Sequence, residues 1–309
     1  MTRASYTPPR HLYPFTSHWL DLRGSRLHYL DEGPREAPPV LMLHGNPTWS
    51  FYYRKLVLAL RGRHRCIVPD HLGCGLSRKP DPARYDYRLA SRIEDIDTLV
   101  NHLGLRQPLA LVVHDWGGMI GMAWAVRNPE RVARLVLMNT AAFPLPAEKR
   151  LPPALALARN SALGAWLVLR LNAFSAIAAR VAFKQPVSSE VRKAYTGPYD
   201  SPANRIATLR FVQDIPLQVG DPGFDILRNT AEHLDRLGNL PCLIAWGEKD
   251  FVFDQSFLRR WLEIYPAAEV HRFADCGHYI LEDGGQKLID TIRSFIEIKE
   301  DSAHEQAGE

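Results

Sequence analysis

Residues Leu109–Gly121, LALVVHDWGGMIG, decide the fold class into which the rest of the chain must fit. The run from Leu109 to Val113 is apolar and partly β-branched, as expected for a strand covered on both faces of a parallel sheet. Gly117, Gly118 and Gly121 then allow a helix to pack closely behind this strand. The stretch therefore predicts a buried strand, an abrupt turn and a glycine-rich helix start.

The turn has the frame of a G-x-S-x-G nucleophile elbow with two changes. Val113 replaces the first small residue, and Asp115 stands at the position of the nucleophile. Parallel sheets bind ligands at the carboxyl ends of their strands. A carboxylate at this tip therefore predicts covalent catalysis through an enzyme ester. The alternative is a strand-end aspartate that only caps the following helix.

Length and composition set the broad class. The chain has 309 residues, 46% hydrophobic and 23% charged, which is typical of a globular protein with one large domain and room for an insertion. Its formal net charge of +4 comes without a Lys/Arg block, so no nucleic-acid partner is expected. The first 22 residues lack the apolar core of a signal peptide, and no apolar run predicts a spanning helix.

The cysteines predict a reducing compartment. None of them forms a C-x-x-C pair, and reduced thiols in a cytoplasmic protein are expected. They are Cys66, Cys74, Cys242 and Cys276. The polar tail after Ile298 is expected to be frayed.

Strand and helix patterns alternate over both ends of the chain. Strands are expected at 25–31, 40–44, 66–69, 109–113, 132–138, 242–246 and 269–273. Helices are expected at 89–103, after the elbow, near 254–265 and at 286–298. This order, with short connections, predicts an α/β fold with a mostly parallel central sheet flanked by helices.

The stretch 143–233 differs, because it is helical in pattern, rich in proline and without a clear strand. We expect it to form a helical cap inserted between two strands, over a core made of residues 1–142 and 234–309. Such an insertion lies over the carboxyl ends of the strands, and therefore above Asp115.

Two further residues complete a candidate catalytic set. His278 lies in ADCGHY, between the last strand and the last helix, where hydrolases of this architecture place a general base. Asp250 follows the strand 242–246 and can fix the tautomer of that histidine. Glu248 is a nearby competitor for this role, and Asn139 ends the preceding strand but is an amide.

The stretch HGNPTWS, residues 44–50, supplies candidate hydrogen-bond donors. The backbone N–H groups of Asn46 and Trp116 are suited to an oxyanion hole. The Asn46 amide and the Trp116 indole are neutral side-chain donors that suit an anionic leaving group, such as a halide or a carboxylate. For Trp116 the alternative is simple core packing. Trp49, Trp166 and Phe174 are candidate apolar walls of the substrate pocket.

The predicted cap is oily and basic. From Lys149 to Ser189 there is no acidic residue. One interpretation is a lid with channels for long alkyl chains and a basic edge against a membrane or a partner enzyme. The other is a pair of packed helices whose arginines extend into solvent.

At these residues the chain resembles the haloalkane dehalogenase group of the α/β-hydrolases. HGNPTWS, HDWGG, WGEKD and CGHY occur in the family's order, and the resemblance runs from about Tyr13 to Ile298. It implies an α/β-hydrolase fold with Asp115 as nucleophile, His278 as base, Asp250 as acid, and Asn46 with Trp116 as leaving-group donors.

The chain looks most similar to one branch, the β-lactone decarboxylases of bacterial long-chain olefin biosynthesis. The stretches PDHLGCGLSRKPDPARYDYRLASRIEDID and NRIATLRFVQDIPL carry that likeness. It implies conversion of cis-3-alkyl-4-alkyl-oxetan-2-ones to cis-alkenes and carbon dioxide without a metal or organic cofactor. It also implies assembly with the thiolase, β-lactone synthetase and reductase of the pathway. The alternative is a haloalkane dehalogenase.

Other activities match the sequence less well. Epoxide hydrolases carry an apolar residue at the Asn46 position and use two cap tyrosines, for which Tyr195 and Tyr199 are candidates. Fluoroacetate dehalogenases have arginine at the position of Trp116, and an esterase needs serine at 115. A non-catalytic scaffold is the alternative of a different class, and the intact set of Asp115, Asp250 and His278 argues against it.

Overall fold

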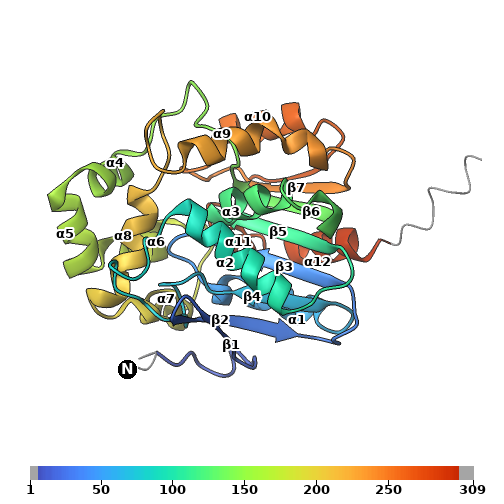
Figure 1. Cartoon of the computed structure of the whole chain (residues 1–309), viewed down its shortest axis with the longest axis horizontal. Coiled ribbons are helices and arrows are strands. Elements are labelled where there is room, and N and C mark those ends of the chain that lie inside the picture. Colours follow the sequence, from blue (N-terminus) through green and yellow to red (C-terminus); the bar gives the residue numbers. More distant parts are fainter. Residues whose placement is uncertain (1–5, 299–309) are drawn as a thin grey trace, which may run out of the picture.

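The computed structural model describes residues 6–298, and its centre is a twisted eight-stranded sheet (Figure 1). The strand order is β1-β2-β4-β3-β5-β6-β7-β8. The strands are β1 His18–Leu22, β2 Ser25–Glu32, β3 Pro39–Leu43, β4 Arg65–Pro69, β5 Leu109–Asp115, β6 Val132–Thr140, β7 Cys242–Gly247 and β8 Glu269–Phe273. Every pair from β4 to β8 is parallel, whereas β2 runs antiparallel to both neighbours. The predicted mostly parallel α/β sheet is confirmed.

Helices cover both faces of the sheet, which explains why its central strands are apolar throughout. Val40 and Met42 of β3 face one core, whereas Leu41 and Leu43 face the other. The helices outside the β6–β7 connection are α1 Arg54–Leu60, α2 Leu89–His102, α3 Trp116–Ala125, α10 Gln255–Ile264, α11 Ile280–Asp283 and α12 Gly285–Glu297. Helices α1 and α12 pack on one face, and α2 and α3 on the other.

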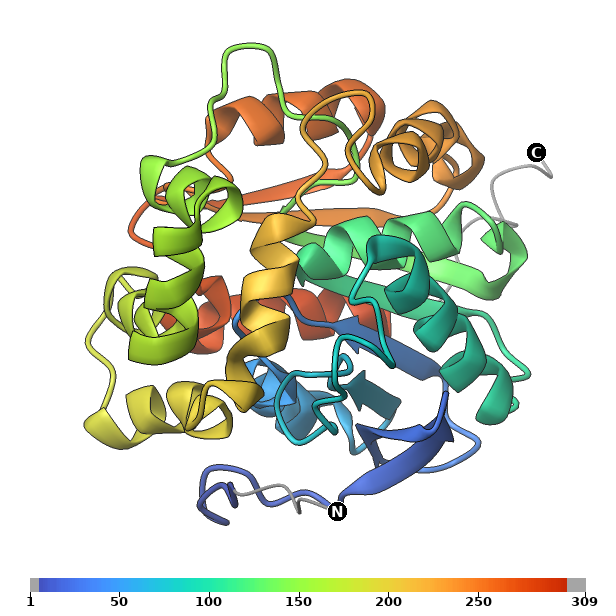
Figure 2. The same ribbon diagram turned by 60° about the vertical axis from the view of Figure 1, so that its left-hand side comes forward.

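Between β6 and β7 the described chain is helical and contains no strand. Its helices are α4 Pro153–Asn160, α5 Ala162–Leu171, α6 Ala173–Val181, α7 Ser189–Thr196, α8 Ile206–Gln213 and α9 Phe224–Glu232. Figure 2 shows α4 to α8 gathered at one end of the sheet, beyond the carboxyl ends of its parallel strands. Helix α9 turns back and packs on α3. The bounds 143–233 remain our prediction for the cap.

Helices α5 and α6 meet at a sharp bend of 76°. Asn172 lies at the bend in the left-handed region, with φ 53°. Together the two helices have the length and composition of a broken membrane span; no single helix within residues 6–298 is long and apolar enough to cross a bilayer. The inner side of α5 packs through Gly164 and Val168 against α4 and α8.

Outside residues 143–233, the strand β1 and the α-helices α1 and α11 were not predicted from the sequence. The edge strand β1 pairs with β2 through a two-residue turn at Arg23 and Gly24, both with positive φ. Helix α1 follows the short helical turn Ser50–Tyr53.

All four cysteines are buried and free. The tail after Ile298 lies outside the described residues, so its predicted fraying stays a prediction.

Candidate active site

The elbow forces Asp115 into an unusual backbone conformation. It joins β5 to α3 with φ 52° and ψ −128°, a region that residues with a side chain rarely adopt. A Cβ at Gly117 would collide with the Leu43 carbonyl, and one at Gly118 with the Thr140 side chain. The Thr140 hydroxyl donates to the Asp115 carbonyl over 2.5 Å. These contacts hold the Asp115 carboxylate at the tip of the sheet.

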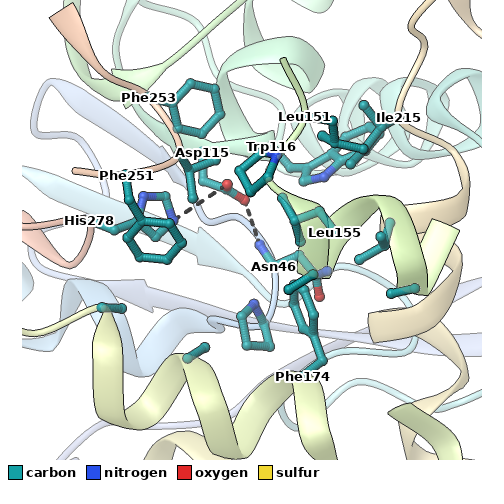
Figure 3. Close-up of a pocket in the computed structure, with 18 of the residues that line it drawn as sticks. Asn46, Asp115, Trp116, Leu151, Leu155, Phe174, Ile215, Phe251, Phe253 and His278 are labelled. Carbon is teal, nitrogen blue, oxygen red and sulfur yellow. Dashed lines mark hydrogen bonds and ion pairs between the residues drawn. The ribbon is translucent and has the colours of Figure 1, made fainter. Parts of the chain in front are cut away.

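The Asp115 carboxylate is buried and held by donors from two sides (Figure 3). The backbone N–H of Asn46 donates to its Oδ1 over 2.7 Å, and His278 Nε2 lies 3.5 Å from its Oδ2. A Cβ at Gly45 would overlap this carboxylate, so only glycine fits there. Burial alone would raise the pKa of Asp115, but the hydrogen bond and charge of His278, together with the Trp116 backbone N–H, hold the pKa below its ordinary value. Asp115 is therefore an anion.

His278 lies between two carboxylates. Its Nδ1 donates to Asp250 Oδ2 over 2.8 Å, and Asp250 Oδ1 accepts from the Val252 backbone N–H over 2.7 Å. Burial opposes the charged form, but the charge of Asp250 and the interactions with Asp115 raise the His278 pKa to about 10. The imidazole is therefore protonated at neutral pH beside the Asp115 anion.

The structure distinguishes Asp250 from its sequence neighbours. Glu248 is 30% exposed and pairs with Arg272 at 3.6 Å, away from His278. Asn139, with φ 33°, exchanges two hydrogen bonds with the backbone of Gly247, over 3.0 and 2.8 Å. It thus joins the ends of β6 and β7, directly before the loop that carries Asp250.

The side-chain donors of Asn46 and Trp116 both reach the cavity beside Asp115. Asn46 Nδ2 donates to the Thr208 carbonyl of α8 over 3.0 Å, which fixes the orientation of the amide and ties the core to the cap. The Trp116 ring packs edge-on against Phe211 at 5.1 Å. Its indole N–H has no hydrogen-bond partner within residues 6–298, so it is available to a ligand.

A cavity of about 280 Å³ begins at these groups and runs beneath the cap. Its wall is apolar apart from Asn46, Asp115, Lys149, His278 and the indole of Trp116. The apolar lining residues labelled in Figure 3 are Leu151, Leu155, Phe174, Ile215, Phe251 and Phe253. The cavity thus presents one anionic nucleophile inside a long apolar enclosure.

Of the three predicted wall residues, only Phe174 lines this cavity. Trp49 is fully buried beneath the cap, where its indole donates to the Ala194 carbonyl of α7 over 3.1 Å and its ring stacks on Phe51. Trp166 is 51% exposed on the outer side of α5. Both expectations were wrong, because the side chain of Trp49 packs into the core and that of Trp166 faces solvent, so that neither lines the cavity.

Phe251, Val252 and Phe253, directly after Asp250, form a cavity wall that was not predicted from the sequence. An apolar triplet in the loop after a candidate catalytic acid was the signal available. His114 was not predicted either; it is buried next to the nucleophile, and its Nε2 lies 2.8 Å from the His278 carbonyl. Burial lowers the pKa of His114 to about 3, so this imidazole is neutral.

The two cap tyrosines do not reach the nucleophile. Tyr195 donates to Glu282 over 2.6 Å, and the Tyr199 hydroxyl lies 3.4 Å from the Thr48 carbonyl. Neither residue lines the cavity. The acids that an epoxide hydrolase requires are therefore not supplied by these residues. Within residues 6–298, no cluster of three or more His, Cys, Asp or Glu side chains is arranged to hold a metal ion.

The sheet, the elbow and the acid–histidine pair define the class of protein. The family profile described as alpha/beta hydrolase fold matches residues 38–285. The chain therefore belongs to the α/β-hydrolase family, and within it to the haloalkane dehalogenase group, as the sequence motifs predicted.

Two relatives and one solved structure narrow the comparison. A cis-3-alkyl-4-alkyloxetan-2-one decarboxylase of Shewanella oneidensis is 54% identical, over 92% of this chain and 89% of the relative. Its namesake from Xanthomonas campestris is 48% identical, over 92% of this chain and 97% of the relative. A crystal structure of a haloalkane dehalogenase from Bradyrhizobium elkani matches with a TM-score of 0.82 and 26% identity, covering 91% of this chain and 97% of that one.

Proposed function

We propose that this protein is a β-lactone decarboxylase that converts cis-3-alkyl-4-alkyl-oxetan-2-ones to cis-alkenes and carbon dioxide. The observation that carries the proposal is the 54% identity, over 92% of the chain, to a protein of that name. The cavity supports it, because a dialkyl lactone needs one nucleophile, donors for a departing carboxylate and apolar walls for two alkyl arms.

In the first step, an Asp115 oxygen attacks the ring carbon that carries the ring oxygen. A carbon–oxygen bond forms to Asp115 as the ring carbon–oxygen bond breaks, and its electron pair leaves on the freed carboxylate. The indole N–H of Trp116 and the remaining amide proton of Asn46 bind that carboxylate in this proposal, which is supported by the position of both residues in the cavity wall. One negative charge moves from the enzyme to the substrate, and no proton is needed.

In the second step, the bond between the carboxylate carbon and its neighbour breaks. Its electron pair forms the alkene, carbon dioxide leaves, and Asp115 departs as a carboxylate. Because the first step inverts the attacked carbon, the ester oxygen lies opposite the bond that breaks. Elimination then requires no rotation, so two cis arms give a cis-alkene.

The charge of His278 suits this second step. An imidazolium 3.5 Å from Asp115 Oδ2 stabilises the carboxylate that departs, and Asp250 keeps that imidazolium in place. Hydrolysis of an ester would instead require His278 to be neutral and to take a proton from water. Attack at the lactone carbonyl, which gives a mixed anhydride, is a second route that uses the same residues.

Haloalkane dehalogenation is the second candidate activity. The likeness to a haloalkane dehalogenase structure supports it, as do the two neutral donors, which also suit a halide. Here Asp115 displaces the halide, and the ester is hydrolysed by water activated by His278 and Asp250. The two candidate activities share their first step and differ in whether water is consumed.

The deciding experiment is incubation with a cis-dialkyl β-lactone and, side by side, with a bromoalkane of matched length. We expect alkene and carbon dioxide from the lactone, and no alkene from the lactone with Asp115→Ala. Alcohol and bromide from the bromoalkane, with no alkene from the lactone, would identify haloalkane dehalogenation as the activity in place of β-lactone decarboxylation. Lactone turnover by Asp115→Ala at the parent rate would show that Asp115 is not the nucleophile.

The partners and the compartment belong to the same proposal. The substrate is the product of a β-lactone synthetase, which supports assembly with that enzyme and with the thiolase and reductase that precede it. The buried free thiols support a reducing, cytoplasmic compartment. Co-purification of the tagged protein with the synthetase from its own host tests the assembly.

A further inference from the structure

The outer sides of α5 and α6 carry large apolar side chains that no part of residues 6–298 covers. Leu163, Trp166 and Leu171 on α5 are 60%, 51% and 59% exposed, and Ile177 and Val181 on α6 are 52% and 40% exposed. Helix α5 forms the far edge of the cap in Figure 1, away from the sheet. Together these five residues define what we call the cap edge.

The spacing on each helix gathers these residues into a stripe. On α5, positions 163, 166, 170 and 171 lie on one side, and on α6 positions 177, 180 and 181 do. Arg170 and Arg180 are therefore part of the same exposed stripes. The opposite sides of the two helices are buried, at Gly164 and Val168 on α5 and at Ser175 and Ala179 on α6. The exposed apolar stripes are therefore separate from the sides that pack within the cap.

The charged side chains of the segment that carries the cap edge, residues 149–189, are all basic. Lys149 pairs with Asp254 and Arg159 with Asp221, both at 2.7 Å, so these cations are neutralised. Arg170 and Arg180 are exposed and have no ion-pair partner within residues 6–298. Arg150 and Lys184, at the two ends of the segment, are likewise exposed and unpaired within that range. No acidic residue lies between Lys149 and Ser189.

The cavity opens at this edge. Leu157, Ile177, Val181 and Phe251 line the cavity and are also exposed, so they mark where it meets the outside. Ile177 and Val181 belong both to the opening and to the cap edge. A molecule leaving the cavity there therefore meets the apolar side chains of Ile177 and Val181, with Arg180 beside them on the same stripe.

We propose that the cap edge docks on the surface of an anionic phospholipid bilayer, so that the cavity opens toward the lipid. Apolar side chains interleaved with unpaired arginines match such a surface, where the chains enter the acyl boundary and the cations meet lipid phosphates. The 76° bend between α5 and α6 suits helices that lie on a membrane. The inference rests on the proposed function only for the lipid-like substrate that would use this opening.

The test is partition of the purified protein into vesicles, measured by flotation without substrate. We expect binding to vesicles of equal parts phosphatidylcholine and phosphatidylglycerol, weaker binding to phosphatidylcholine alone, and release by salt. Arg170→Gln with Arg180→Gln should lower the partition about fivefold for each charge removed. Arg35→Gln with Arg106→Gln is the matched control, because these exposed arginines precede β3 and β5 at the other end of the sheet.

Trp166 provides a second measurement, because its side chain is more exposed than that of any other tryptophan in residues 6–298. Brominated lipids should quench its fluorescence, and Trp166→Ser should abolish that quenching and lower the partition about tenfold. Equal binding to both vesicles, binding to neither, or an equal loss in the control pair would overturn the proposal. Turnover of a detergent-dispersed β-lactone by the Arg170/Arg180 variant should match the parent, which separates this test from that of the activity.

Discussion

The Nε2 atom of His278 lies 3.5 Å from Oδ2 of Asp115, within an ion pair of two buried side chains. The pKa of Asp115 is lowered while that of His278 is raised to about 10, so each group stabilises the charge of the other. Once Asp115 becomes an ester, its charge is lost and the His278 pKa must fall. The protonation state of this histidine therefore reports how far the reaction has gone.

His278→Ala should separate the two candidate activities. With a bromoalkane, the Asp115 ester forms but is not hydrolysed, so mass spectrometry should show the protein with the added alkyl group. With a cis-β-lactone, no water is consumed and alkene should still form. It should form about 10 to 150 times more slowly, because a charged hydrogen bond to the departing carboxylate is lost. A stable lactone adduct with no alkene would contradict this mechanism.

The stability of the fold should depend on pH through the same pair. Because the His278 pKa is raised above its unfolded value of about 6.5, its charge stabilises the fold fully below that pH. The contribution is lost as the pH rises through about 10. Denaturant unfolding of the parent and His278→Gln should therefore differ most near about pH 6 and converge in alkaline solution. His102→Gln, at an exposed position, is the control and should show no such trend.

The positions of Asp115, Asp250 and His278 follow from the sequence because each lies at, or a few residues after, the carboxyl end of a predicted parallel strand. The carboxyl ends of parallel strands meet at one edge, so residues far apart in the chain converge there. Strand periodicity and one glycine-rich turn were therefore enough to predict the fold and the candidate site. The catalytic roles of these residues remain predictions until the variants are measured.

The cap could not be predicted at the same level. On an oily helix, the side that faces inward depends on neighbours that come from distant parts of the chain. Trp166 points outward because Gly164 and Val168 fill the contact of α5 with α4 and α8. Phe251 and Phe253 lie in a loop and follow no helical or strand period, so the apolar triplet after Asp250 was the one sequence signal for this cavity wall.

Trp116→Phe should weaken catalysis without disturbing the core. Phenylalanine keeps an aromatic ring against Phe211 but removes the indole N–H that faces the departing carboxylate. We expect kcat/KM for the β-lactone to fall about 10- to 150-fold, as for the loss of a charged hydrogen bond. Trp124→Phe, in the same helix, removes an indole that donates to Asp97 over 3.0 Å and should leave kcat/KM unchanged. An equal loss in both variants would mean that α3 had been disturbed.

Phe174, which lines the cavity from α6, should limit the length of the alkyl arms that the cavity accepts. Each buried methylene contributes about 0.8 kcal/mol, so kcat/KM should rise about fourfold per carbon until the cavity of about 280 Å³ is full. Phe174→Ala enlarges the cavity and should move that limit to longer arms. Trp166→Ala, on the exposed side of α5, should leave the limit in place when detergent-dispersed β-lactones are compared. Movement of the limit by Trp166→Ala, with none by Phe174→Ala, would mean that the arms bind outside this cavity.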